Sequence, residues 1–278
     1  MSGSGSMPSL NHRRLGRTNL LVSELGLGAM DTPQSDQGEE TLHLALDLGI
    51  NFIDTARIYQ GSEYLIGKVI RAREDKSFHI ASKTINRTRD GAQYDVDRSL
   101  RLLGLDSIAL YQLDDVSTLE DWQAVMSEEG ALAGLQVARE RGLIGHIGMS
   151  SHNLEVLEQA ITCGEFDTVM LEYSAFFRET ERLIVLAKER DVGVIVMRPL
   201  GGSGRMSFLR TRMAAAHEAS LTPARLLTYV LSNPDISVAI AGVRYPSRVR
   251  ENVETASTYT PFDEAARREV EREAGLLF

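Results

Sequence analysis

The sequence predicts an α/β fold: a (β/α)8 (TIM) barrel with an N-terminal β-hairpin and an extra C-terminal helix. From about Leu25 onward, short apolar segments alternate with longer amphipathic ones, as in the βα units of a parallel sheet. The apolar segments are continuous rather than alternating in hydrophobicity, which is typical of strands covered on both faces. Eight units in about 250 residues favour a closed barrel over an open doubly wound sheet.

The predicted units can be given as residue ranges. Strands are expected at 24–28, 51–54, 78–83, 108–113, 145–150, 168–173, 193–199 and 237–242. The helices between and after them are expected at 38–48, 62–71, 92–103, 131–141, 154–162, 179–190, 223–232 and 246–256. Glycine just after a helix, or proline early in one, marks several borders, at Gly49, Gly104, Gly142, Pro223 and Pro246.

Four segments lie outside this repeat. Residues 11–23 contain turn formers and predict the hairpin, while 263–275 have alternating charge and predict the last helix. The long break at 201–221 is glycine-rich at its start and contains three arginines, so it is a candidate lid or phosphate loop. Residues 1–9 are expected to form a disordered tail, which leaves 10–278 as a single domain.

Composition and charge narrow the class of protein. The chain has 278 residues, of which 25% are charged and 43% hydrophobic, which excludes a disordered or fibrous protein. Its 30 basic and 39 acidic side chains give a formal net charge of −9, so we expect neither a nucleic-acid nor a membrane partner. The one cysteine, Cys163, excludes a disulfide framework, and the histidines lack metal-ligand spacing. With no signal-peptide pattern at the N-terminus, a cytoplasmic location is expected.

Polar side chains stand where three predicted strands end. Asp54 ends the second strand, Lys83 ends the third, and Asp114 directly follows the fourth, while Tyr59 comes five residues after Asp54. We expect these side chains to meet at the barrel mouth, where the chemistry of such folds takes place. Lys83 would stabilise the phenolate and lower the pKa of Tyr59, so that Tyr59 serves as a general acid toward a carbonyl oxygen. The alternatives are a structural ion pair between Asp54 and Lys83 and a surface position for Tyr59.

Six ordered motifs resemble those of one family. They are NFIDTARIYQGSEYLIG at 51–67, IASKT at 80–84, LYQLDDV at 110–116, GLIGHIGMSSHN at 142–153, VMRPLGG at 196–202 and AIAGVRYPSRVREN at 239–252. With the N-terminal segment 13–30, this nearly end-to-end pattern resembles the aldo-keto reductases. The resemblance implies a (β/α)8 barrel that uses NADPH, or less often NADH, and moves hydride between the nicotinamide and a small-molecule carbonyl substrate.

Carried over by position, the resemblance assigns catalytic roles to Asp54, Tyr59 and Lys83. The family usually has a histidine where this chain has Asp114. An ionised carboxylate cannot donate a hydrogen bond to the substrate and would repel the negative charge that develops on its oxygen. If Asp114 is dry enough, its pKa is expected to rise until it stays protonated and donates. A retuned enzyme, an impaired enzyme and an engineered change are the open interpretations.

The resemblance also assigns an adenosine end of the cofactor site. Arg244 and Arg248 match positions that hold the adenosine 2′-phosphate, and Glu251 and Asn252 match adenine contacts, which favours NADPH (NADP+) over NADH. The alternative is an ordinary solvated basic turn. Further cofactor contacts are expected at Leu200, Gly201, Gly202, Ser203, Gly204 and Gly242.

The nicotinamide end departs further from the family pattern. Ser150 matches the serine of a Ser-Asn pair that holds the carboxamide, while Ser151 replaces the asparagine. Met170 stands where many relatives have glutamine, and Met197 where many have a tyrosine that stacks on the ring. Arg198 follows it, as a basic residue does in one branch of the family. For both methionines the alternative is core packing.

Substrate contacts are the least defined part of the prediction. Candidate walls are Met30, Asp31, Arg57, Ile58, Trp122, Phe176, Phe177 and the loop around Phe208. Arg57 suits an anionic or polyhydroxylated substrate, or pairs with Asp31 or Asp114. Trp122 lines the mouth or simply packs.

The leading functional prediction is NADPH-dependent carbonyl reduction. Two alternatives are a low-turnover cofactor-binding redox sensor and an enzyme that reduces a conjugated double bond or oxidises an alcohol or sugar. No heptad pattern or large apolar stripe indicates an oligomeric state.

Overall fold

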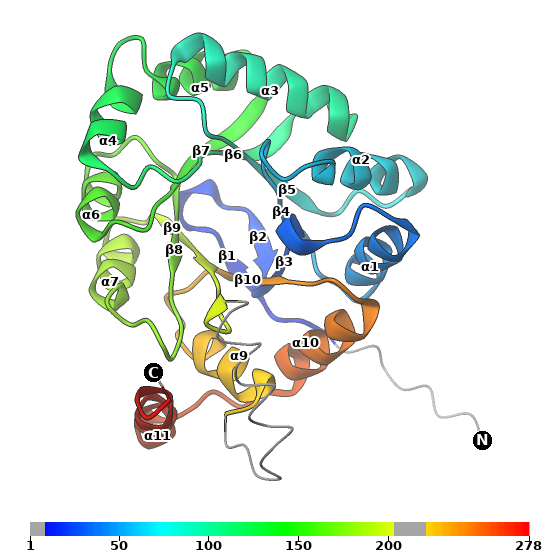
Figure 1. The fold of residues 1–278 in the computed structure, drawn as a ribbon, viewed down its shortest axis with the longest axis vertical. Coiled ribbons are helices and arrows are strands. Elements are labelled where there is room, and N and C mark those ends of the chain that lie inside the picture. Colours follow the sequence, from blue (N-terminus) through cyan, green and yellow to red (C-terminus); the bar gives the residue numbers. More distant parts are fainter. Residues whose placement is uncertain (1–8, 203–220, 278) are drawn as a thin grey trace.

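The computed structural model describes residues 9–202 and 221–277, and within them the chain closes into a barrel of parallel strands surrounded by helices (Figure 1). The order around the barrel is β10, β3, β4, β5, β6, β7, β8 and β9. A separate antiparallel pair, β1 with β2, forms the hairpin. The predicted fold class is confirmed. Most of the predicted lid or phosphate loop, including Ser203, Gly204, Phe208 and its three arginines, lies outside the described residues.

The strands of the hairpin and the barrel are β1 (His12–Arg14), β2 (Leu21–Ser23), β3 (Leu25–Gly28), β4 (Phe52–Asp54), β5 (His79–Thr84), β6 (Ile108–Leu113), β7 (Ile144–Ser150), β8 (Thr168–Glu172), β9 (Gly193–Met197) and β10 (Val238–Gly242). The helices are α1 (Asp36–Asp47), α2 (Ser62–Ala72), α3 (Arg89–Leu103), α4 (Leu119–Met126), α5 (Ala131–Glu140), α6 (Leu154–Thr162), α7 (Glu181–Glu189), α9 (Pro223–Leu231), α10 (Pro246–Thr258) and α11 (Glu264–Gly275). Among the described residues, no helix is long and apolar enough to cross a membrane.

Among the differences from the sequence prediction, the end of one strand and one additional helix have clear local reasons. Strand β9 ends at Met197, before the predicted end at residue 199, because Arg198 has a left-handed backbone with φ of 53°. Helix α4 was not predicted. It begins at a Thr118 cap, whose hydroxyl accepts a hydrogen bond from the amide of Asp121, but it buries just one of its eight residues, Val125. Its apolar periodicity is therefore weak.

The alternation of side chains along each strand decides which residues reach the interior of the barrel. Phe52, Ala81, Leu110 and Met170 belong to the cluster that fills the barrel together with Leu15 and Val22 of the hairpin segment. Because side chains repeat every second residue, the same interior face continues two residues on, to Asp54, Lys83, Gln112 and Glu172. The parallel register brings these strand ends to one mouth. Outside the strands, a second and larger apolar cluster packs the sheet against the helices.

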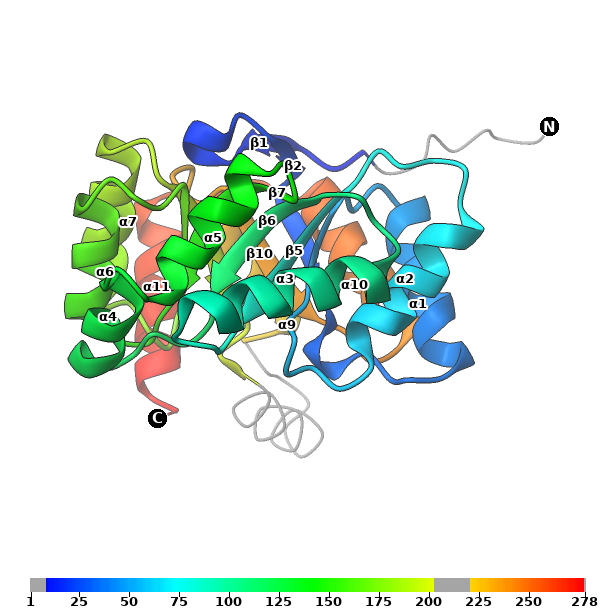
Figure 2. The same ribbon diagram turned by 90° about the horizontal axis from the view of Figure 1, so that it is seen from above.

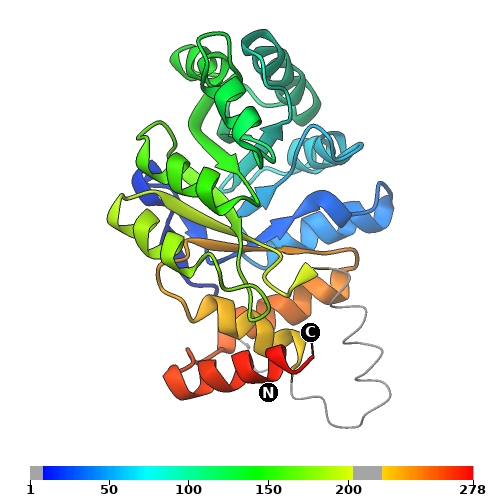
Figure 3. The same ribbon diagram turned by 60° about the vertical axis from the view of Figure 1, so that its left-hand side comes forward.

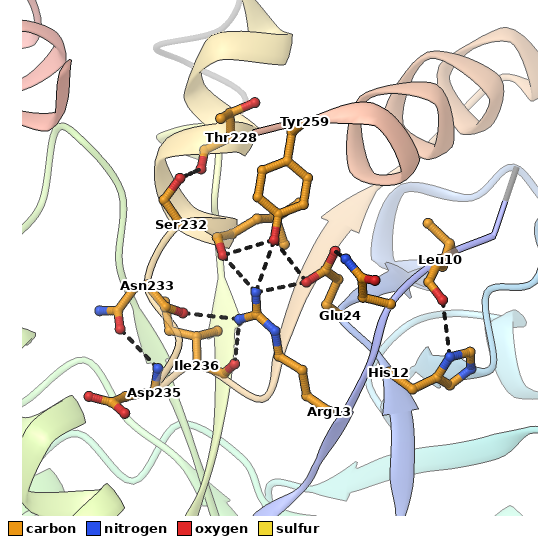
Figure 4. A network of polar contacts seen from close by, with 12 residues as sticks. Leu10, His12, Arg13, Glu24, Thr228, Ser232, Asn233, Asp235, Ile236 and Tyr259 are labelled. Carbon is orange, nitrogen blue, oxygen red and sulfur yellow. Dashed lines mark hydrogen bonds and ion pairs between the residues drawn. The ribbon is translucent and has the colours of Figure 1, made fainter. Parts of the chain in front are cut away.

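The hairpin closes the opposite end of the barrel (Figure 2). Arg13, which belongs to β1 of this hairpin, lies at the centre of a polar network (Figure 4). Its guanidinium pairs with Glu24 at 2.7 Å, donates to the hydroxyl of Tyr259 at 3.1 Å, and also donates to the carbonyl oxygens of Leu231, Asn233 and Ile236. These carbonyls lie at and just beyond the end of α9, so one side chain joins the hairpin to the last helices.

Helix α11 packs along α9 (Figure 3). Arg225 of α9 pairs with Glu273 of α11 at 2.7 Å, and the hydroxyl of Tyr229 donates to Glu271 at 2.8 Å. The Tyr229 ring stacks on Tyr173, with the ring centroids 5.8 Å apart. The predicted C-terminal helix is therefore tied to the barrel wall by polar contacts, some of them with buried tyrosines.

Candidate active site

Lys83 is the centre of a buried cluster at the barrel mouth. Its side chain is 1% exposed, and its ammonium group donates to Asp54 Oδ2 at 2.7 Å and to the carbonyl of Thr55 at 2.8 Å. Its third contact is with the hydroxyl of Tyr59, 3.4 Å away, and the ammonium lies 4.8 Å from the centroid of the Tyr59 ring. Gln112 donates to the other oxygen of Asp54 at 3.4 Å. The structure thus brings Asp54, Tyr59 and Lys83 together, as the sequence predicted.

Burial sets the electrostatics of this cluster. Desolvation raises the pKa of Asp54 to about 6, although Lys83 opposes the shift, and the charge of Asp114 adds to it. Burial opposes the charged form of Lys83, but the surrounding acidic groups, Asp54 first among them, still raise its pKa. At neutral pH the ammonium and the Asp54 carboxylate therefore form an ion pair out of contact with water.

The pKa of Tyr59 moves in the direction opposite to the one predicted. Burial raises it to about 12, and the charges of Asp54 and Asp114 add to that shift, so the lowering effect of Lys83 is outweighed. Lys83 does lower the pKa of Tyr59, but the prediction that the pKa ends below its usual value is wrong. The sequence does not reveal how deeply the phenol is buried. The hydroxyl keeps its proton at neutral pH, which suits a group that gives a proton away.

Asp114 lies beside this cluster and is 7% exposed. Its Oδ1 accepts a hydrogen bond from the Ser150 hydroxyl at 2.9 Å. The Ser150 oxygen in turn accepts from the amide of Asp115 at 2.8 Å, so its single proton is directed at Asp114. Arg87 donates to the main-chain oxygen of Asp114 at 2.8 Å rather than to the carboxyl group. Within the described residues, the only hydrogen bond to the Asp114 carboxyl comes from Ser150.

The predicted nicotinamide end is largely engaged in contacts within the protein. Ser150 is bound to Asp114, and the Ser151 hydroxyl accepts from the amide of Asn153 at 3.0 Å. Met170 is 2% exposed and belongs to the interior cluster, against which the partly buried Met197 also packs. The core-packing alternative therefore describes Met170, while Met197 lies nearer the mouth at the end of β9.

The turn that follows β9 contains four of the predicted cofactor contacts, Arg198, Leu200, Gly201 and Gly202. Arg198 pairs with Glu172 at 2.9 Å, and both glycines have positive φ, at 85° and 83°. A left-handed arginine is uncommon and costs about 1–3 kcal/mol, and such strain is concentrated at functional sites. The local geometry is compatible with the predicted approach of main-chain amides to a phosphate.

The predicted adenosine-end residues lie around α10. Arg244 pairs with Asp31 at 3.0 Å, and Arg248 pairs with Glu251 one turn along the helix. A cavity of about 810 Å³ between α9 and α10 is lined by Arg248, Glu251 and Asn252, together with Thr222, Pro223, Ala224, Thr228, Glu254, Thr255, Thr258 and Tyr259. Gly242 is exposed, and a Cβ there would meet Asp31 at 3.6 Å. The cavity volume is within the range of about 300–1,000 Å³ usual for ligand pockets.

The candidate substrate residues do not form one group. Met30 is 70% exposed, while Phe176 packs on the outer core. Trp122 packs on Phe166, with ring centroids 6.1 Å apart, and Phe166 precedes the amino end of β8 rather than its mouth end. The packing alternative therefore describes Trp122.

Arg57 pairs with Glu63 and, at 3.5 Å, with Asp95. The prediction that Arg57 pairs with Asp31 or Asp114 is wrong. Asp31 pairs with Arg244 instead.

The sequence reasoning missed Gln112 and Glu172 as residues of the mouth. Glu172 is 7% exposed, lies at the end of β8 and approaches His152 at 3.8 Å as well as pairing with Arg198. The signal that selected Asp54, a polar residue at the end of an apolar strand, applies equally to Glu172. Gln112 could have been found by counting two residues on from the interior Leu110.

Comparisons with known proteins agree with this arrangement. The sequence profile described as "Aldo/keto reductase family" matches residues 24–271. The chain is 26% identical to the uncharacterized oxidoreductase YqkF of Bacillus subtilis, over 89% of this chain and 92% of that protein. It is 27% identical to L-galactose dehydrogenase of Arabidopsis thaliana, over 89% of this chain and 88% of that one.

Among solved structures, the holo form of the aldo-keto reductase AKR11C1 from Bacillus halodurans superposes with a TM-score of 0.81 at 26% identity, over 95% of this chain and 96% of that one. Because the family profile matches most of its length, the chain belongs to the aldo/keto reductase family of oxidoreductases. Members of this family act on small molecules and generally use nicotinamide cofactors.

Proposed function

We propose that this protein reduces an aldehyde or ketone to the alcohol with NADPH, and that Tyr59 donates the proton. The observation that carries this proposal is the protonated Tyr59 hydroxyl, which lies 3.4 Å from a buried ammonium. A bound nicotinamide would supply the hydride. The cofactor fits the residues at its adenosine end, because a cavity of about 810 Å³ is lined by Arg248, Glu251 and Asn252.

Three side chains of the protein itself would carry out the proton transfer, each in a different role. Asp54 keeps Lys83 charged and fixed, since it accepts from the ammonium at 2.7 Å within a dry site. Lys83 faces the phenol oxygen, so it stabilises the negative charge that develops there as the proton leaves. Tyr59 supplies that proton to the carbonyl oxygen of the substrate. The ion pair is already assembled, so little reorganisation is needed during the reaction.

NADPH consumption with a panel of aldehydes and ketones tests this proposal. We expect Tyr59→Phe to lower kcat about 10²–10⁴-fold, the usual contribution of a general acid, while the affinity for NADPH stays unchanged. Equal rates in the wild type and Tyr59→Phe would remove Tyr59 from the mechanism.

Asp114 favours a second candidate function, the oxidation of an alcohol or sugar. A carboxylate that is held by Ser150 accepts hydrogen bonds, and an alcohol can donate one whereas a carbonyl cannot. The similar protein from Arabidopsis thaliana is named for the oxidation of a sugar, L-galactose.

Comparing wild type with Asp114→His in both directions of the reaction separates the two functions. If oxidation is the natural function, the His variant should gain reduction of simple aldehydes and ketones, and should lose oxidation of those alcohols or sugars that are not the products of these reductions. A His variant that gains no carbonyl reduction would contradict a retuning role for Asp114.

A further inference from the structure

The loop that carries Tyr59 runs beside the strand that carries Lys83, and Arg57 belongs to this loop, two residues before Tyr59. The loop connects β4 to α2 and spans residues 55–61. Its main chain follows β5, because the amide of Thr55 donates to the carbonyl of Ala81 at 2.8 Å and the amide of Arg57 donates to the carbonyl of Lys83 at 3.0 Å. Two residues beyond Arg57, the chain presents the Tyr59 hydroxyl to the Lys83 ammonium.

The side chain of Arg57 points to the helices outside the barrel. Its guanidinium is 18% exposed and forms an ion pair with Glu63 of α2, whose side chain is 2% exposed. Its Nε lies 3.5 Å from Oδ1 of Asp95 on α3, whose side chain is 10% exposed; this second contact is an ion pair without a hydrogen bond. One arginine therefore joins the Tyr59 loop to two helices through largely buried carboxylates.

The same two carboxylates hold the strand on either side of Lys83. The Ser82 hydroxyl donates to Glu63 at 2.6 Å, and the Thr84 hydroxyl donates to Asp95 at 2.5 Å. Because side chains alternate along a strand, Ser82 and Thr84 face the helices while Lys83 faces the interior. Arg57 is thus linked to the strand of Lys83 both through its amide and through the partners of its guanidinium.

We propose that Arg57 is a positioning residue that sets the contact between the Tyr59 hydroxyl and the Lys83 ammonium. This inference rests on the proposed role of Tyr59. A guanidinium can bind two carboxylates at fixed angles, whereas the ammonium of a lysine is a single point charge on a flexible stem. Replacing Arg57 by lysine keeps the charge but loses one of the two links, so the Tyr59 loop should move more freely against β5.

Arg57→Lys can be compared with Arg13→Lys as a matched control. Both arginines have side chains that are 18% exposed and pair with a carboxylate at most 2% exposed, but Arg13 lies at the opposite end of the barrel. We expect Arg57→Lys to lower kcat at least about 10-fold, with KM and the dissociation constant of NADPH within about 2-fold of wild type. The solvent isotope effect on kcat should rise, because proton donation becomes slower than the other steps. Arg13→Lys should keep the wild-type kcat and isotope effect.

Amide hydrogen exchange gives a readout that does not depend on turnover. Exchange of the amides in residues 55–61 should become faster in Arg57→Lys and stay unchanged in Arg13→Lys. Unchanged exchange in this loop, or equal loss of kcat in the two variants, would overturn the positioning role. If wild type and Tyr59→Phe turn over carbonyls at the same rate, the proposed function fails, and the exchange comparison still decides whether Arg57 fixes the loop.

Discussion

The two ends of the barrel each contain a cation paired with a buried carboxylate beside a partly buried tyrosine, and they use these groups differently. At the hairpin end, Arg13 pairs with Glu24 at 2.7 Å, and the Tyr259 hydroxyl donates to the same carboxylate at 3.0 Å. At the mouth, Lys83 pairs with Asp54, also at 2.7 Å. Each tyrosine hydroxyl accepts a contact from its cation, but only Tyr259 also donates to the carboxylate of its pair. Tyr259 has committed its proton within the protein, whereas Tyr59 donates to no acceptor among the residues that the structure describes.

The choice of cation accounts for this difference. The guanidinium of Arg13 has several donors in a fixed plane, and its two terminal nitrogens satisfy three backbone carbonyls as well as Glu24 and Tyr259. The ammonium of Lys83 places two donors on Asp54 and Thr55 and directs the third toward a phenol. The Arg13 network stabilises the hairpin end of the barrel, whereas the Lys83 network holds the Tyr59 hydroxyl at the mouth.

The largest expected effect on stability comes from the hairpin end. Arg13→Met leaves Glu24, which is 1% exposed, without its cation, and we expect the free energy of unfolding to fall by about 3–5 kcal/mol. Urea unfolding measures this loss, and kcat per folded molecule should stay at the wild-type value. Arg14→Met is the control: its partner Asp191 is half exposed, so stability should change little. If Arg13→Met reduces kcat as strongly as Lys83→Met does, the two ends are not separate in function.

The mouth should show its own pH dependence. The folded-state pKa of Asp54 is about 6, above its usual value of about 3.9 in an unfolded chain. Between these values the folded protein binds the extra proton, so the Asp54 contribution to stability should fall as pH rises, by about 1.4 kcal/mol per pH unit.

Urea unfolding of wild type and Asp54→Asn between about pH 4.5 and 6 measures this slope, which the Asn variant should lack. Asp191→Asn is a useful contrast, because Arg14 holds the pKa of Asp191 below its usual value, so the Asp191 slope has the opposite sign and lies below about pH 4 instead of in this range. Parallel pH curves for wild type and Asp54→Asn would contradict the burial of this carboxyl group.

A smaller effect is expected at the cavity between α9 and α10. Arg248→Ala should weaken NADPH binding about 10- to 100-fold, since a charge-assisted hydrogen bond to phosphate is worth about 1.5–3 kcal/mol, and should leave NADH binding unchanged. Fluorescence titration with each cofactor measures both affinities. Arg250→Ala, on the exposed side of the same helix, is the control. Equal weakening toward NADPH and NADH would argue against a 2′-phosphate contact at Arg248.

The smallest effect is expected for Trp122, and it tests whether a residue of the outer helix α4 contacts the substrate. Trp122 of α4 packs on Phe166, so Trp122→Phe should cost about 0.5–1.5 kcal/mol of stability and leave KM unchanged. Steady-state kinetics beside thermal unfolding checks both. A several-fold rise in KM at unchanged stability would restore Trp122 as a substrate contact.

Local patterns in the sequence predicted the barrel and much of the mouth. Apolar segments marked all eight strands, and a polar residue at a strand end singled out Asp54 and Lys83 because parallel strands end together. Helix α4 was missed because a helix that buries one of eight residues lacks a periodic apolar face.

What the sequence could not predict depends on three-dimensional surroundings. The partners of Arg57 lie on two different helices, so no spacing along the chain indicates them. The hydroxyl of Ser150 is bound to Asp114, a contact between neighbouring strands that a position-by-position comparison does not reveal. The rise of the Tyr59 pKa comes first from burial, which is a property of the folded protein.

The most direct test of the contrast between the two ends is to measure kcat and unfolding side by side for Tyr59→Phe and Tyr259→Phe. We expect Tyr59→Phe to lose at least about 100-fold in kcat with little change in stability. Tyr259→Phe should lose stability and keep its kcat, because its hydroxyl serves the Arg13 network. Wild-type turnover in Tyr59→Phe, or a comparable loss of kcat in Tyr259→Phe, would contradict the assignment of the chemistry to the mouth.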